Sequence, residues 1–248
     1  MMYIIFLIIL TVMFALVPII DALPSRKPKP DVITEKMQCR SYLRLIAFYW
    51  GFAAPVAVMS LIGGISPAEI GFRLINFNQN IWFTVIALVA GGLVFVYSAY
   101  EFIASVASKK FKEDFIEEYT NDNSGTLRII PRTKKEKKLY SLVALSTAVC
   151  EETVYRGFLL FLLYAVFPGI SVYIILLIAF VTFGAGHLYQ GLKNAVSIGL
   201  FATVSMGLLI AADSLVPLIL LHFIGEASAI FALSPSEFNQ DAQHKGAT

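Results

Sequence analysis

The chain has 248 residues, of which 58% are hydrophobic and 15% are charged, and its mean hydropathy is +0.75. This apolar share lies well above that of soluble domains and excludes an ordinary soluble globular protein. The formal net charge of +2 says little by itself, and we expect a lipid bilayer and no nucleic acid as the partner.

Windows of roughly 18 to 25 apolar residues have the length that crosses a bilayer as an α-helix. We therefore expect an all-α, polytopic transmembrane helical bundle with about seven spans. The first window lacks the basic start of a signal peptide, so a retained first helix is expected. The windows are Met2–Ile20, Leu45–Ile65, Ile81–Tyr100, Ser141–Phe167, Ser171–Tyr189, Asn194–Ala212 and Leu215–Leu233.

The sequence also predicts where the fourth helix starts and ends, and where one of the connections lies. The helix formers Lys134–Lys138 lead into the window, so its helix is expected to start there as a cytoplasmic extension. Pro168-Gly169 should end that helix. The segment Ser66–Asn80, with its Gly71-Phe72-Arg73 turn, is expected to lie at the membrane interface.

Lys and Arg are unevenly distributed among the connections. Asp21–Arg44 holds six and Glu101–Tyr140 holds nine, whereas the connections facing the other side hold only Arg73. Positive charge in short loops stays cytoplasmic, which predicts the N-terminus outside and the C-terminus inside. The predicted parts are 1–140 with three helices and two basic cytoplasmic loops, 141–233 with a four-helix catalytic core, and a cytoplasmic tail, 234–248. The short loops favour a bacterial plasma membrane over an organellar one.

Three charged residues interrupt the fourth apolar window. Glu151, Glu152 and Arg156 would cost roughly 8–10 kcal/mol together in a bilayer if nothing paired them. Glu152 lies one helical turn before Arg156, in the favourable order for an ion pair. Glu151 is rotated by about 100° and is left as a buried carboxylate, the better candidate for proton transfer. The alternative is that all three only pin this helix to its neighbours.

Two histidines lie in the fifth and seventh apolar windows. His187 shares a helix face with Phe183, and the glycines beside it should let a neighbouring backbone approach closely. His222 is followed one turn later by Glu226. Taken alone, each histidine is equally compatible with a hydrogen-bonded core residue.

The three helices bury their unusual residues most cheaply together, in a wet cleft lined by Glu151, His187 and His222. A carboxylate and two imidazoles around a water molecule can deprotonate it and bind the resulting oxyanion, which is hydrolase chemistry. The same His, His, Glu set would also suit zinc, although no HExxH is present. Cys150 is disfavoured as a nucleophile because it points about 100° away from Glu151.

The ordered motifs EExxxR at Glu151, FxxxH at Phe183 and HxxxE at His222 resemble the CPBP intramembrane metalloproteases, which include type II CAAX prenyl endopeptidases and Abi-like bacteriocin-processing enzymes. The resemblance covers about Ser141 to Leu233. It implies a cone-shaped helical bundle with a cavity open to cytosol and lipid. The chain departs from the pattern at Glu226, where the family has Asn or Asp.

Carried over by position, the resemblance implies that Glu151 activates water together with His187 and that His222 stabilises the oxyanion. Glu152 and Arg156 would support the site. The expected function is cleavage of a membrane-associated protein or peptide, with or without a prenyl group. Two alternatives are an ion- or proton-coupled transporter and a non-catalytic binding or immunity protein of the same family. The transporter would require inverted repeats and broken helices, which the sequence does not show.

Overall fold

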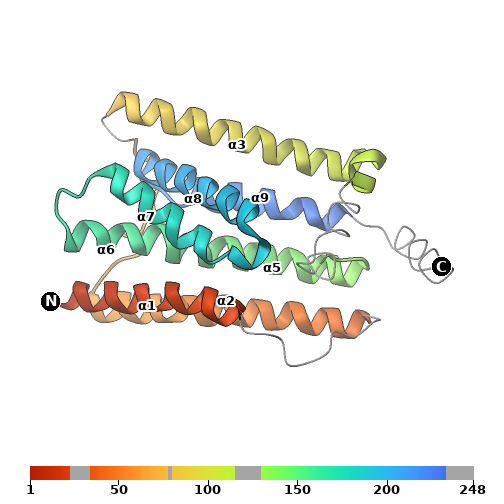
Figure 1. The fold of residues 1–248 in the computed structure, drawn as a ribbon, viewed down its shortest axis with the longest axis horizontal. Helices are drawn as coiled ribbons and strands as arrows, with labels where there is room; N and C mark the ends of the chain where they lie inside the picture. Colours follow the sequence, from red (N-terminus) through yellow and green to blue (C-terminus); the bar gives the residue numbers. More distant parts are fainter. Residues whose placement is uncertain (23–33, 78–79, 115–129, 233–248) are drawn as a thin grey trace. The chain divides into compact units, whose positions relative to one another are not determined.

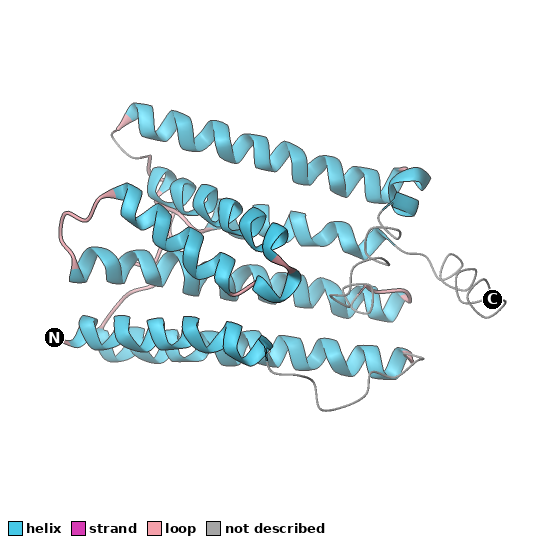
Figure 2. Cartoon of the chain, viewed as in Figure 1, coloured by secondary structure: helices cyan, strands magenta, loops and turns pink. Residues whose placement is uncertain are grey.

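The computed structural model describes residues 1–22, 34–77, 80–114 and 130–232, and all regular structure in these ranges is helical (Figure 2). This confirms the expected all-α class. Figure 1 labels the α-helices in chain order. They are α1 Met2–Ala22, α2 Glu35–Gly63, α3 Ile81–Ala107, α5 Lys134–Glu152, α6 Leu159–Val166, α7 Val172–Ala185, α8 Leu192–Ala212 and α9 Val216–Ala232.

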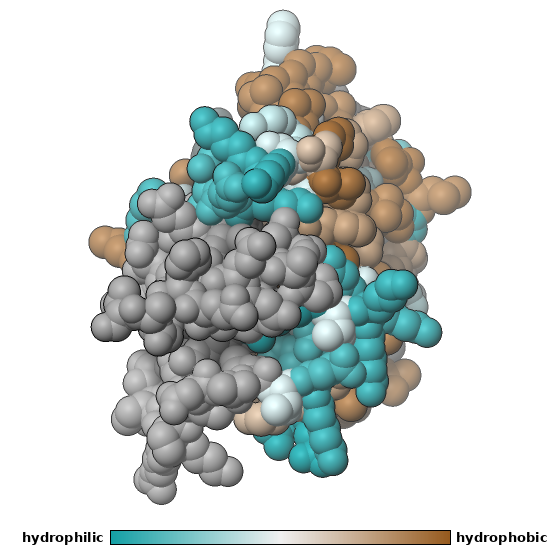
Figure 3. Space-filling view, turned by 90° about the vertical axis from the view of Figure 1, so that its right-hand side faces the viewer, coloured by the Kyte–Doolittle hydropathy of each residue, from teal (hydrophilic) through white to brown (hydrophobic). Residues whose placement is uncertain are grey.

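Three of the described helices, α2, α3 and α8, are long and apolar enough to cross a bilayer. The outer faces of the helices expose large apolar side chains, as lipid-facing helices do: Ile8 on α1, Leu61 on α2 and Trp82 on α3 are each more than half exposed. One face of the molecule shows such hydrophobic surface next to hydrophilic surface (Figure 3). The seven spans and their orientation stay predictions.

Helix α2 begins ten residues earlier than the expected span, so the prediction that 21–44 is wholly a loop is wrong. The reason is an N-cap at Thr34, whose hydroxyl accepts a hydrogen bond from the Met37 amide at 3.3 Å. Arg40 and Arg44 therefore lie on a helix. The cations Arg26, Lys27 and Lys29 and the predicted tail 234–248 lie outside the described residues.

Helix α5 begins at Lys134, as expected, because Thr133 and Glu136 form a capping box. The Glu136 carboxylate accepts hydrogen bonds from the amides of Arg132 at 2.7 Å and Thr133 at 3.2 Å. The Glu136 amide in turn donates to the Thr133 hydroxyl at 3.2 Å. The helical path ends at Phe167, directly before Pro168-Gly169, also as predicted.

The chain divides into two compact units. The first unit comprises the described parts of Met1–Pro28, Gly51–Phe95 and Val149–Leu220, and the second comprises those of Lys29–Trp50, Val96–Ala148 and Leu221–Thr248.

Close helix packing in the first unit depends on small residues. A Cβ at Gly184 of α7 would lie 2.9 Å from the Ala195 carbonyl oxygen of α8. A Cβ at Gly199 of α8 would lie 2.9 Å from the Phe180 ring of α7. The two helices therefore approach at a distance that a larger residue would prevent, which confirms the packing expected at Gly184.

Candidate active site

The charged motif lies where α5 changes its helical form. Glu151 and Glu152 are the last two residues of α5, and a π-helical segment, Thr153–Phe158, follows and carries Arg156. Such segments are rare and frequently occur at functional sites. The prediction of an uninterrupted α-helix from Ser141 to Phe167 is therefore wrong at this point.

Gly157 accounts for part of this local departure. A Cβ at Gly157 would lie 2.2 Å from the Ile70 carbonyl oxygen and 2.8 Å from Leu215 Cδ1. The connection between α2 and α3 thus packs directly on the backbone of the π-helical segment, and only glycine leaves room for it.

Glu152 and Arg156 form the expected ion pair. The Arg156 Nε lies 3.3 Å from the Glu152 Oε2, and both side chains are completely buried. The contact lacks hydrogen-bond geometry, so the attraction is mainly between the charges. Glu151, beside this pair in sequence, is 8% exposed, which agrees with the buried carboxylate that the sequence predicts.

The Arg156 guanidinium has a second partner, the ring of Phe183 on α7. The Cζ of Arg156 lies 3.9 Å from the ring centre, within cation–π range. Neither terminal nitrogen of Arg156 makes a hydrogen bond with the described residues. The buried cation is therefore held by one carboxylate and one aromatic face.

His187 lies just beyond α7, not inside a helix as the sequence analysis predicted. Helix α7 ends at Ala185, and His187 follows in a turn before the short 3₁₀ segment Leu188–Gln190. Its Nδ1 lies 2.9 Å from the Phe183 carbonyl oxygen, and the two rings are 4.8 Å apart. Since a carbonyl only accepts, Nδ1 carries the hydrogen, and in the neutral ring Nε2 then carries the lone pair.

An aromatic cluster that the sequence analysis missed surrounds these residues. Tyr155, in the π-helical segment, stacks on Phe14 at 4.3 Å and meets the edge of Phe183 at 5.0 Å. The ring of Phe52 also stacks with that of Tyr155, with 5.8 Å between the ring centres. In the sequence, only the position of Tyr155 directly before Arg156 in the charged motif pointed to this cluster. Its aromatic partners lie in distant segments, at no regular spacing from Tyr155.

His222 and Glu226 lie on the second-unit part of α9. The His222 Nε2 is 3.4 Å from the Glu226 Oε1, which confirms the predicted one-turn pairing. His222 is 9% exposed. Glu226, at the position where the resemblance expects Asn or Asp, thus still reaches the imidazole.

The structure brings together Glu152, Arg156, Phe183 and His187 in the first unit, and His222 with Glu226 in the second. The convergence of Glu151, His187 and His222 on one water molecule stays a prediction. No group of three or more His, Cys, Asp or Glu within the described ranges is placed to hold a metal ion. Zinc stays a prediction.

Comparison with known protein families gives a match. Residues 138–228 match a protein-family model described as type II CAAX prenyl endopeptidase Rce1-like. This confirms the family resemblance drawn from EExxxR, FxxxH and His222, and the matched range contains all seven candidate residues. No curated protein and no solved structure matches the chain.

Proposed function

Because residues 138–228 form an Rce1-like domain, we propose that the chain is an intramembrane endopeptidase that cleaves a membrane-associated protein or peptide. The observation that carries the proposal is the fixed position of His187. Its Nδ1 is held by Phe183, whose ring in turn rests against the buried Arg156. A carboxylate, Glu151, is buried one residue before the Glu152 that pairs with this arginine.

In the proposed reaction Glu151 is the general base and His187 assists it through Nε2. The carboxylate removes a proton from water while the water oxygen forms a bond to the peptide carbonyl carbon. The tetrahedral intermediate carries negative charge on the former carbonyl oxygen. It collapses when the carbon–nitrogen bond breaks and Glu151 returns the proton to the departing amine.

His222 is the proposed donor to the oxyanion. Glu226 at 3.4 Å from Nε2 orients the ring, and Nδ1 of the protonated ring would supply the hydrogen bond. An acid at position 226 is compatible with this orienting role. Glu226 itself cannot donate to an oxyanion unless it is protonated.

The depth of the site favours a substrate that enters from the basic side of the membrane. Glu151 lies roughly 15 Å along the helix from Ser141, where the fourth apolar window begins. A peptide anchored in the bilayer, prenylated or not, can place a bond at that depth. The match to an Rce1-like domain favours neither the transporter nor the immunity interpretation.

The test uses the full-length chain in liposomes with a membrane-tethered peptide. Glu151→Gln and His187→Ala should each abolish cleavage while the far-ultraviolet circular dichroism stays helical. Cys150→Ser is the matched control, because it changes the adjacent buried side chain and should retain cleavage. Retained cleavage in Glu151→Gln would refute the assignment, and loss only in Cys150→Ser would identify a thiol mechanism instead.

A further inference from the structure

A cavity in the first unit lies apart from the proposed catalytic residues. It has a volume of about 340 Å³, at the lower end of the range of small-molecule pockets. Its walls come from the connection between α2 and α3, from the end of the π-helical segment and α6, and from the end of α8. Glu69, Arg73, Phe161, Tyr164, Ala165 and Asp213 are among the lining residues.

Part of the wall of this cavity is formed by two segments that are joined by hydrogen bonds and an ion pair, the α2–α3 connection and the turn between α8 and α9. The Leu215 amide donates to the Gly71 carbonyl at 2.8 Å, and the Asn76 amide donates to the Ala212 carbonyl at 2.9 Å. Arg73 forms an ion pair with Asp213 and also donates through Nε to the Asp213 carbonyl at 3.0 Å. Six residues of loop are thus pinned to the turn between α8 and α9, so the cavity is preformed.

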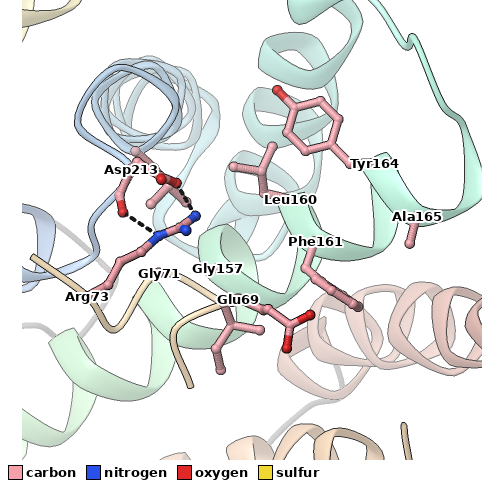
Figure 4. A pocket seen from close by; sticks show the side chains of 11 residues that line it. Glu69, Gly71, Arg73, Gly157, Leu160, Phe161, Tyr164, Ala165 and Asp213 are labelled. Atoms are coloured by element: carbon pink, nitrogen blue, oxygen red, sulfur yellow. Dashed lines mark hydrogen bonds and ion pairs between the residues drawn. The ribbon is translucent and has the colours of Figure 1, made fainter. Parts of the chain in front are cut away.

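Three charged side chains line the cavity, namely Glu69 and the paired Arg73 and Asp213. In the view of Figure 4 the Glu69 carboxylate and the Phe161 ring are on one side, and the Arg73–Asp213 pair is on the other. Hydrogen bonds from the Ser66 amide and hydroxyl, each 2.8 Å, lower the pKa of Glu69, so this carboxylate is charged near neutral pH. The lining of the cavity therefore includes a carboxylate, an aromatic ring and a guanidinium that is paired with Asp213.

The surroundings of the cavity are apolar and exposed. On the same loop, exposed fractions are 37% for Phe72, 91% for Leu74, 52% for Ile75 and 55% for Phe77. The backbone hydrogen bonds at Gly71 and Asn76 hold the loop that carries Phe72, Leu74 and Ile75. Such a surface is typical of a segment that rests in the interfacial layer of a membrane, as the sequence analysis expected for Ser66–Asn80.

We propose that this cavity binds the head group of a zwitterionic phospholipid. The ammonium group lies between Glu69 and the Phe161 ring, and the phosphate faces Arg73. An ammonium group is attracted by the charge of a carboxylate and by the face of an aromatic ring, and guanidinium groups bind phosphate well. The acyl chains would continue over the exposed apolar loop. The proposal does not depend on the hydrolase assignment, because none of these residues belongs to the proposed catalytic set.

The test measures retention of short-chain lipids by the purified full-length protein in detergent, by native mass spectrometry, and the accompanying rise in Tm. The probes are dihexanoyl phosphatidylethanolamine, dihexanoyl phosphatidylglycerol and soluble phosphoethanolamine. We expect the first to bind at least about fivefold more tightly than the other two, the magnitude of an exposed charge pair. Equal binding of phosphatidylglycerol would overturn the proposal, as would equal binding of phosphoethanolamine, which would indicate a soluble ligand.

Two variants localise the binding. Glu69→Gln should weaken phosphatidylethanolamine binding about fivefold while leaving peptide cleavage unchanged. Ala165→Leu should fill the cavity and abolish retention of the lipid. Glu113→Gln removes an exposed carboxylate of the second unit and is the matched control for the first variant. Unchanged lipid binding in both cavity variants, or an equal loss in Glu113→Gln, would refute the site.

Discussion

The guanidinium carbon of Arg156 lies 3.9 Å from the centre of the Phe183 ring. The same phenylalanine accepts a hydrogen bond from His187 through its backbone carbonyl, so a buried cation supports the residue that orients the histidine. The arginine is also 3.3 Å from the Glu152 carboxylate. This chain of contacts makes Arg156 a positioning residue in the proposed mechanism, and its contacts with Glu152 and with Phe183 can be tested separately.

The first prediction concerns the buried ion pair. Arg156→Gln should lower the free energy of unfolding by about 3–5 kcal/mol, because it removes the buried cation that lies 3.3 Å from the Glu152 carboxylate. The free energy of unfolding should fall less in the double variant Glu152→Gln/Arg156→Gln than in the single arginine variant, since neither charge of the pair remains. Reversible unfolding in mixed micelles measures both. A double variant as unstable as the sum of the two single variants would contradict the coupling.

The second prediction concerns the aromatic partner. Phe183→Leu keeps an apolar side chain and the carbonyl that holds His187, but it removes the ring beneath the cation. The free energy of unfolding should fall by about 2 kcal/mol more than in Phe180→Leu, where a ring of the same helix is lost without a cation. Equal losses in the two variants would show that the ring serves only as packing volume.

The third prediction compares two glycines in helical segments. Gly157→Ala would place a Cβ 2.2 Å from the Ile70 carbonyl oxygen and should cost about 1–3 kcal/mol through backbone displacement. Gly92→Ala would meet no atom within 4 Å among the described residues and should stabilise α3 by about 0.5–1 kcal/mol. Thermal unfolding of the two variants in one detergent measures the difference. A neutral Gly157→Ala would show that the loop does not press on the π-helical segment.

The fourth prediction is a pH dependence at Glu69. Its pKa is lowered by the amide and hydroxyl of Ser66, so the folded state holds the ionised form more favourably than the unfolded state. The resulting stability is fully present above the ordinary glutamate pKa of about 4.3 and is lost as the pH falls through the lower folded value. Tm measured between pH 3 and 6 should therefore fall less steeply in Glu69→Gln, on the order of the effect of one exposed carboxylate. Ser66→Ala should give an intermediate profile, and identical profiles in all three proteins would refute this assignment.

Several features could be predicted from the sequence because they depend on local spacing. The helical class, the start of α5 at Lys134 and the end of α6 before Pro168 follow from composition, capping and helix-breaking residues. The ion pair of Glu152 with Arg156 and the contact of His222 with Glu226 each join residues one turn apart, so the spacing alone places the partners on one face.

Tertiary structure decided the features that join distant segments. The π-helical form of Thr153–Phe158 coincides with the close approach of the Ile70 backbone to Gly157. The hydrophobic periodicity of the sequence does not predict this π-helical form. The ring of Phe183 under Arg156 depends on how α7 packs, and the Arg73–Asp213 pair joins residues 140 positions apart. Hydropathy and spacing report which face of a helix is apolar, whereas these contacts depend on which other segment that face meets, because close packing is a property of the assembled bundle.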